Sequence, residues 1–106
     1  MYKRQPKCHV GKKDGFRDIY GRMWWDRPSP TITTKFFSLS NGRFGHPEED
    51  RAISLREGAV LQSFPIEYIF KTNSIEKTAR MIGNAVPPKY ATAIGNAIIQ
   101  NHHNAV

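Results

Sequence analysis

The stretch Ile82-Gly83-Asn84-Ala85-Val86-Pro87-Pro88 combines a predicted helix end, a short connector and a predicted helix start. Gly83 can adopt a positive φ, which ends a helix without the steric strain that a Cβ would cause. A proline such as Pro88 suits the first helical turn, where its missing amide hydrogen costs nothing. A connector specified this tightly predicts a close approach of its backbone to something else, either another helix or a ligand.

Three helices are predicted around this connector, near residues 54–64, 74–83 and 88–101. Ser54 and Glu57 match a capping box, in which the side chain of each residue accepts a hydrogen bond from the backbone amide of the other. This pattern indicates that the first helix begins directly after Ser54.

The third predicted helix contains a glycine, Gly95, which costs about 1 kcal/mol relative to alanine in a helix interior. We therefore expect another element to approach this helix closely at Gly95. Helical spacing predicts that its buried face consists of Tyr90 or Ala91, Ile94, Ala97 and Ile98.

An extended region is predicted between residues 20 and 45. The segment from Thr31 to Phe37 is dense in β-branched and aromatic residues, the strongest strand signal in the chain. Trp24 and Trp25 are adjacent, so an extended backbone would direct one toward the core and the other toward a partner. The expected fold class is α+β, a small unit in which a short antiparallel β region precedes about three helices.

The chain is basic, with 16 Lys and Arg against 9 Asp and Glu among 106 residues, a net charge of +7. Residues 1–27 hold eight of the basic and three of the acidic residues, so this part alone carries 8 − 3 = +5. The excess fits a polyanionic partner, above all nucleic acid, and it equally fits a solvated basic arm or loop over residues 1–19.

Several other kinds of site are not indicated. Cys8 is the only cysteine and cannot form an internal disulfide, which predicts a reducing, cytoplasmic location. Cys8 and His9 lack further ligands at the spacing of a zinc site, so no metal site is predicted. The run Glu48-Glu49-Asp50 could act in acid–base chemistry, but three adjacent acids beside a proline are typical of a solvated loop. No apolar run approaches the roughly 20 residues that a membrane-spanning helix needs.

Three blocks of the sequence resemble, in order, the C-terminal part of DNA cytosine-5 methyltransferases. Gly21 to Thr34 is similar to the end of the family's target recognition region, His46 to Pro65 to motif IX, and Ile82 to Pro88 to motif X. The resemblance implies a basic arm or loop at 1–19, the end of the recognition region with motif IX at 20–73, and motif X with the C-terminal helix of the cofactor domain at 74–106.

The resemblance also implies a fold and a cofactor. Joined to an N-terminal part that is missing here, the segment would complete a Rossmann-like α/β methyltransferase fold. Asn84, Ala85 and Val86 would then line the pocket for S-adenosyl-L-methionine, whereas the residues alone favour an ordinary helix–helix connector. The implied partners are double-stranded DNA and the catalytic N-terminal part of the methyltransferase.

Candidate DNA contacts follow from the same resemblance and from residue chemistry. Thr31 matches a threonine that lies against DNA in the family, where its hydroxyl would position a phosphate or sugar. Arginine and lysine side chains can bind phosphates and guanine, so Arg22, Lys35 and Arg43 are further candidates. Each of them taken singly could also be an ordinary exposed charge. Arg56 and Glu57 match motif IX and are expected to be structural.

The chain departs from the family pattern in motif IX. Gly58 and Val60 stand where the motif usually carries alanine and arginine, and Ile66 follows Phe-Pro where an aspartate is often found. The loss of that arginine would remove a scaffold or phosphate contact.

The catalytic parts of the family are missing from this sequence. The Pro-Cys pair that holds the nucleophile, the Glu-Asn-Val that carries the acid, and the glycine-rich cofactor loop do not occur, and Pro6-Lys7-Cys8 is not that pair. No catalytic residue is assigned, and we expect the chain alone to be inactive.

Two hypotheses therefore remain. In the first, the chain is part of a methyltransferase, either its C-terminal segment or one subunit of a split enzyme, and the family suggests a restriction–modification setting. In the second, it is a stand-alone, non-catalytic DNA-binding protein or remnant. Exposed apolar surface on the last two helices would favour the first.

Overall fold

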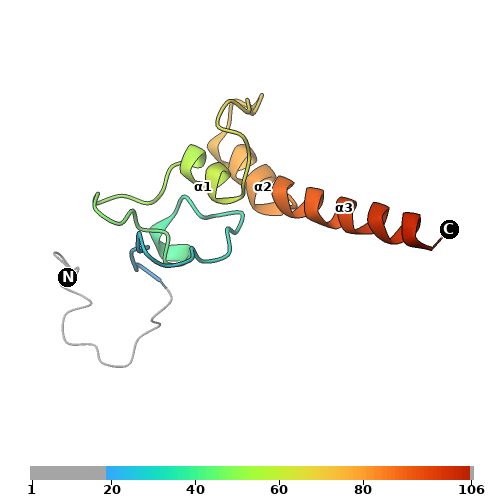
Figure 1. The fold of residues 1–106 in the computed structure, drawn as a ribbon. Helices are drawn as coiled ribbons and strands as arrows, with labels where there is room; N and C mark the ends of the chain where they lie inside the picture. Colours follow the sequence, from blue (N-terminus) through green and yellow to red (C-terminus); the bar gives the residue numbers. More distant parts are fainter. Residues whose placement is uncertain (1–18, 106) are drawn as a thin grey trace.

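The structure is a computed structural model that describes residues 19–105. Its elements are a short 3₁₀-helix, η2 (Leu39–Asn41), and three α-helices, α1 (Leu55–Leu61), α2 (Ile75–Asn84) and α3 (Pro88–Asn104). Figure 1 shows α1 and α2 side by side next to the loops of residues 19–54, with α3 projecting away from both. Among these elements, only α1 and α2 pack against each other.

The three predicted helices are confirmed, with small changes at their ends. Ser54 Oγ accepts the Glu57 amide at 3.2 Å, and Glu57 Oε2 accepts the Ser54 amide at 2.6 Å, which completes the predicted capping box. α1 ends at Leu61, before the expected residue 64, because Ser63 adopts a φ of 63° and turns the chain out of the helix. Pro88 occupies the first turn of α3 as expected.

The prediction of an antiparallel β region near residues 20–45 is wrong, since residues 19–105 contain no strand. Gly45 makes two isolated bridges there, a parallel one to Arg22 and an antiparallel one to Ala52. The segment with the strongest strand signal forms a turn at residues 34–37. The segment packs against helices and not against another strand, so its Ile32 and Phe36 side chains enter the core without a β ladder. The described part is mainly helical and irregular.

The core joins the loop half of the molecule to α1 and α2. Its aromatic members, Phe36 and Phe44, come from loops, and both side chains are almost fully buried. The buried apolar residues together are Ile32, Phe36, Phe44, Ile53, Ala59, Ala79 and Ile82. The two tryptophans do not take part as expected, because Trp24 and Trp25 are both exposed, by 52% and 72%.

Two helix glycines let the segment from Ile32 to Phe36 lie directly on the helices. A Cβ at Gly58 would lie 2.3 Å from the Phe36 ring, and a Cβ at Gly83 would lie 2.6 Å from the Thr33 carbonyl oxygen. Gly83 does not have the predicted positive φ, and α2 continues through the next residue. The predicted close approach at the connector is confirmed, but the approaching element is a loop of the same chain.

The predicted buried face of α3 is wrong for this chain. α3 contains no buried residue, and Tyr90 and Ile98 are more than 60% exposed, at 61% and 64%. A Cβ at Gly95 would meet no other atom within 4 Å, so the element expected at this glycine is also missing from residues 19–105. No helix within that range has the length and apolarity needed to cross a membrane.

Gly83→Ala is expected to lower the free energy of unfolding by about 1–3 kcal/mol, because the new methyl group would overlap the Thr33 backbone, which cannot move aside as a side chain could. Gly58→Ala is also expected to destabilise, because the new methyl group would overlap the Phe36 ring, which is fully buried in the core. Denaturant unfolding followed by circular dichroism measures both effects.

Gly95→Ala is the matched control, because it makes the same change in open space. It is expected to stabilise α3 by up to about 1 kcal/mol, the difference in helix propensity between glycine and alanine. Equal stability of the Gly83→Ala and Gly95→Ala variants would contradict the close packing at Gly83.

Candidate functional site

The connector between α2 and α3 presents the predicted cofactor residues to solvent. Asn84 is the last residue of α2, and its exposed side chain makes no hydrogen bond with any residue in 19–105. Ala85 is the extended C-cap of α2, with φ −71° and ψ 142°, and Val86 is 61% exposed. One polar amide and one apolar side chain therefore face outward from a short, defined backbone.

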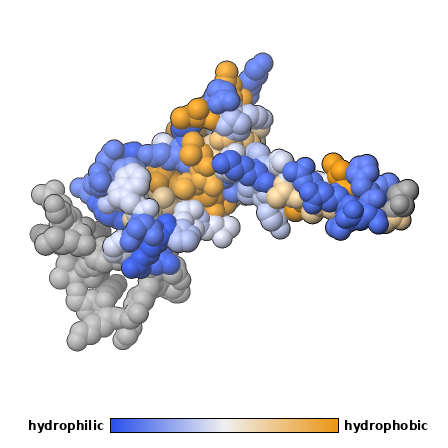
Figure 2. All heavy atoms as spheres, viewed as in Figure 1, coloured by the Kyte–Doolittle hydropathy of each residue, from blue (hydrophilic) through white to orange (hydrophobic). Residues whose placement is uncertain are grey.

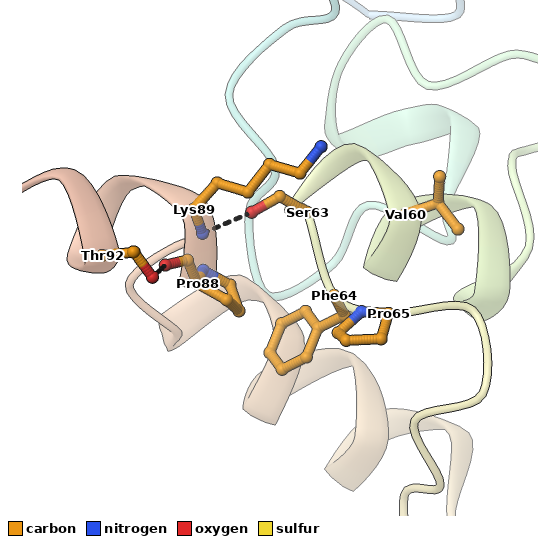
Figure 3. A pocket seen from close by; sticks show the side chains of 7 residues that line it. All are labelled: Val60, Ser63, Phe64, Pro65, Pro88, Lys89 and Thr92. Atoms are coloured by element: carbon orange, nitrogen blue, oxygen red, sulfur yellow. Dashed lines mark hydrogen bonds between the residues drawn. The ribbon is translucent and has the colours of Figure 1, made fainter.

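The residues that directly follow α1 hold both ends of this connector. Gln62 Nε2 donates to the Ile82 carbonyl at 3.1 Å and to the Ala85 carbonyl at 3.5 Å. Ser63 Oγ accepts the Lys89 backbone amide at 3.1 Å, as Figure 3 shows. The sequence analysis did not identify Gln62 and Ser63, because a local pattern cannot indicate a hydrogen-bond partner that lies 20 or more residues away.

The loop that carries Thr31 and Lys35 meets the connector through its backbone. Thr33 and Thr34 lie against Gly83, the residue immediately before Asn84. Thr31 and Lys35 are exposed on this loop, and neither side chain makes a hydrogen bond within residues 19–105. The fold thus brings one candidate DNA segment next to the candidate cofactor segment.

The two candidate arginines differ in their surroundings. The stem of exposed Arg43 covers Gly21, where a Cβ would lie 2.5 Å from Arg43 Cγ, and its guanidinium makes no hydrogen bond in the described part of the chain. Arg22 instead donates to the His46 carbonyl at 2.8 Å, to the Glu49 carbonyl and to the Asp50 carboxylate. Arg22 is therefore engaged in holding the loop of residues 46–50.

The acidic run in this loop is exposed, as expected for a solvated loop, but its carboxylates have partners. Glu48 Oε1 accepts Trp25 Nε1–H at 3.0 Å, and Glu49 Oε2 accepts Arg51 Nε–H at 2.5 Å. The remaining carboxylate, Asp50, is bound by Arg22. Because each acid is already paired, the run is a structural cluster and does not offer a free acid–base pair.

A bidentate ion pair joins this loop to α1. Arg51 donates to Glu57 Oε2 at 2.7 Å and to Oε1 at 2.9 Å. The hydrogen bonds from Arg51, reinforced by those from Ser54, hold the pKa of Glu57 at about 2, below its ordinary 4.5. The hydrogen bond from Arg51 likewise lowers the pKa of Glu49, and the two carboxylates raise the pKa of Arg51.

His46 completes this cluster from the buried side. Its Nδ1 accepts the amides of Glu48 and Glu49 at 3.2 and 3.0 Å, and its Nε2 lies 3.6 Å from Glu57 Oε1. Arg56 forms a separate brace by donating to the Tyr68 carbonyl at 2.9 Å. These contacts agree with the structural role expected for Arg56 and Glu57.

A shallow hollow of about 480 Å³ lies where the end of α1 meets the start of α3. Most of its lining is apolar, as Figure 3 shows, and Lys89 is its only charged residue. Its walls are Val60, Ser63, Phe64, Pro65, Pro88, Lys89 and Thr92. The hollow lies beside the connector, and its lining contains no carboxylate, histidine or cysteine.

Within residues 19–105, no three His, Cys, Asp or Glu side chains lie close enough together to bind a metal ion. Cys8 and His9, which were considered as metal ligands from the sequence, lie outside the described residues. The described part of the chain therefore adds no candidate metal centre.

Comparison with protein families matches residues 9–100 to the C-5 cytosine-specific DNA methylases. The chain is 47% identical over 96 residues to a type II methylase of Herpetosiphon aurantiacus, covering 87% of this chain and 27% of that protein. It is 44% identical over 85 residues to a type II methyltransferase of Bacillus subtilis, covering 80% and 20%. The mouse DNA (cytosine-5)-methyltransferase 1 is 42% identical over 94 residues, covering 85% and 6%. The chain thus spans about a quarter or less of the length of these relatives.

Acidification is expected to destabilise the fold through Glu57. Its folded-state pKa of about 2 lies below its ordinary value of 4.5, so its contribution to stability is fully present above pH 4.5 and is lost as the pH falls toward 2. Urea unfolding midpoints measured between pH ~6 and ~2 are expected to fall across this window.

Glu57→Gln is expected to flatten this pH dependence and to lower stability at neutral pH by about 1 kcal/mol, because it removes the charge that pairs with Arg51 while glutamine can keep the capping-box geometry. Glu67→Gln is the control, because Glu67 is exposed and its carboxylate has no partner within residues 19–105. A Glu57→Gln variant with the wild-type pH profile would exclude this carboxylate as the source.

Proposed function

We propose, because this chain belongs to the C-5 cytosine-specific DNA methylase family, that it is the C-terminal segment of a restriction–modification DNA cytosine-5 methyltransferase. In this role it contributes the end of the target recognition region and one wall of the S-adenosylmethionine site. The remaining catalytic part of the enzyme supplies the nucleophilic cysteine and the rest of the cofactor pocket.

The exposed apolar surface of α3 carries this proposal. Tyr90, Ile94 and Ile98 recur every four residues, which places them along one side of the helix, and all three are exposed. Figure 2 shows apolar residues on the surface of this projecting helix. Most of the stability of a helix in a protein comes from the packing of its apolar face, so the exposed apolar side of α3 favours a partner that covers it. The partner we propose is the cofactor domain of the same methyltransferase.

The chemistry of the connector fits a cofactor wall. The exposed Asn84 amide can both donate and accept hydrogen bonds. Ala85 and Val86 are small and apolar, so a ligand can lie close to their backbone. S-adenosylmethionine, which this family uses, would supply the methyl group, while these residues would bind and orient it.

Thr31, Lys35 and Arg43 are the proposed DNA contacts, because their side chains are exposed and have no hydrogen-bonded partner within residues 19–105. Their hydroxyl and cationic groups suit phosphates and guanine. Arg22 holds the acidic loop, so its proposed effect on DNA binding acts through that loop.

A chimera tests the proposal directly. This chain replaces the matching segment of the Herpetosiphon methylase, and the transfer of labelled methyl groups to DNA is measured. The chimera is expected to be active and the isolated chain inactive, because the chain lacks the cysteine nucleophile. Methyl transfer by the pure isolated chain would overturn the proposal, as would a folded, DNA-binding chimera without activity.

The same chimera tests the cofactor wall. Asn84→Ala is expected to weaken S-adenosylmethionine binding by about fivefold, the cost of one hydrogen bond, with DNA affinity unchanged. Asn73→Ala removes another exposed asparagine, away from the connector, and is expected to have no effect. Two results together would instead indicate a stand-alone DNA-binding protein. The isolated chain would bind DNA with an affinity that falls with salt, and Asn84→Ala would leave the affinity of the chimera for the cofactor unchanged.

A further inference from the structure

We propose that Gln62 and Ser63 are positioning residues, which fix the connector between α2 and α3 to the C-terminal end of α1. Their hydrogen bonds to the connector stand independently of any function. The consequence for cofactor binding rests on the proposed function, in which this connector forms one wall of the S-adenosylmethionine site.

The start of α3 cannot cap itself. The first amides of a helix have no intrahelical acceptor, and the N-cap side chain usually accepts one of them. The N-cap of α3 is Pro87, whose side chain has no polar atom, and Pro88 has no amide hydrogen. Ser63 Oγ accepts the Lys89 amide at 3.1 Å, so the cap of α3 comes from the residue that follows a different helix.

The end of α2 is held in the same way by the neighbouring residue. The last carbonyls of a helix lack ordinary intrahelical donors, and within residues 19–105 the Ile82 carbonyl accepts only the amide of the C-cap Ala85, at 3.2 Å, from the backbone. Gln62 Nε2 donates to the Ile82 carbonyl at 3.1 Å and lies 3.5 Å from the Ala85 carbonyl, so one amide group bridges the two sides of Asn84. Two consecutive side chains therefore satisfy helix-terminal groups on both sides of the proposed cofactor wall.

The backbone of Ser63 supports a role beyond ending α1. The Ser63 amide bonds to the Val60 carbonyl at 2.8 Å and the Phe64 amide to the Ala59 carbonyl at 2.9 Å, the paired pattern of a Schellman motif. The left-handed position in this motif is usually glycine, yet Ser63 occupies it with φ 63° despite the Cβ. A strained residue at this position is explained by its hydroxyl, which glycine could not supply.

Ser63→Gly separates stability from positioning, because it relieves the backbone strain and removes the hydroxyl together. In the 106-residue chain, hydrogen exchange of the Lys89 amide measured by NMR is expected to become about fivefold faster. The Ala91 amide, bonded to Pro87 O at 2.9 Å, is the internal control and is expected to keep its rate. Ser63→Asn, which tolerates this φ and offers a carbonyl acceptor, is expected to restore part of the protection.

In the chimeric methyltransferase, Ser63→Gly and Gln62→Ala are each expected to weaken S-adenosylmethionine binding about fivefold, with DNA affinity unchanged. For Ser63→Gly the thermal midpoint is expected to stay the same or rise. A purely structural role predicts only the change in midpoint. Thr92→Val is the matched control, because it also removes a hydroxyl from this hollow. The Thr92 hydroxyl bonds only within α3, to Pro88 O at 2.9 Å.

The outcomes distinguish this inference from the proposed function. Unchanged Lys89 exchange in the Ser63→Gly chain would overturn the inference outright. If Asn84→Ala weakens cofactor binding and Ser63→Gly does not, the positioning role is also overturned. If Lys89 exchange responds while neither variant changes cofactor affinity, the fixation of the connector is supported and the failure lies with the cofactor wall.

Discussion

The packing of one loop against two glycine-bearing helices is the contact on which the rest of this structure depends. Phe36 lies over Gly58 in α1, and the Thr33 backbone lies over Gly83 in α2. These contacts bury Ile32 and Phe36 in the core together with Ala59 and Ile82. Without a sheet, no ladder of backbone hydrogen bonds orders the N-terminal half of the described chain, and close packing on the helices takes its place. The loop with candidate DNA contacts is thereby set beside the candidate cofactor connector.

Local sequence patterns predicted the local features of the fold well. The capping box at Ser54 and the proline at the start of α3 depend on neighbours within a few residues, and the structure contains both. The β region failed because β propensity reflects packing of branched and aromatic side chains, and here helices and not strands provide that packing. The burial expected for α3 failed for a related reason. An apolar stripe predicts that something covers the helix, but not that the cover belongs to the same chain.

The candidate site shows the same division between local and distant information. Residue type and family resemblance selected Asn84, Thr31 and Arg43, and the structure leaves all three exposed. Charge alone could not separate Arg43 from Arg22, because only the folded chain brings Arg22 to the acidic loop. The roles of Gln62 and Ser63 were also invisible in the sequence, since their hydrogen-bond partners lie 20 to 26 residues further along the chain. The residues that follow α1 thus hold the connector through side chains that no local sequence pattern singled out.

The contact between Phe36 and Gly58 also has a consequence for how this sequence can diverge. The ring occupies the space that a side chain at residue 58 would need, so the two positions share one fixed volume. Glycine at position 58 is then the counterpart of a large residue at position 36. Evolution can add a methyl group at one position only after removing volume at the other, so related sequences should change at both positions together. The order of such paired substitutions would be constrained as well. A smaller side chain at position 36 would have to appear before a larger one at position 58.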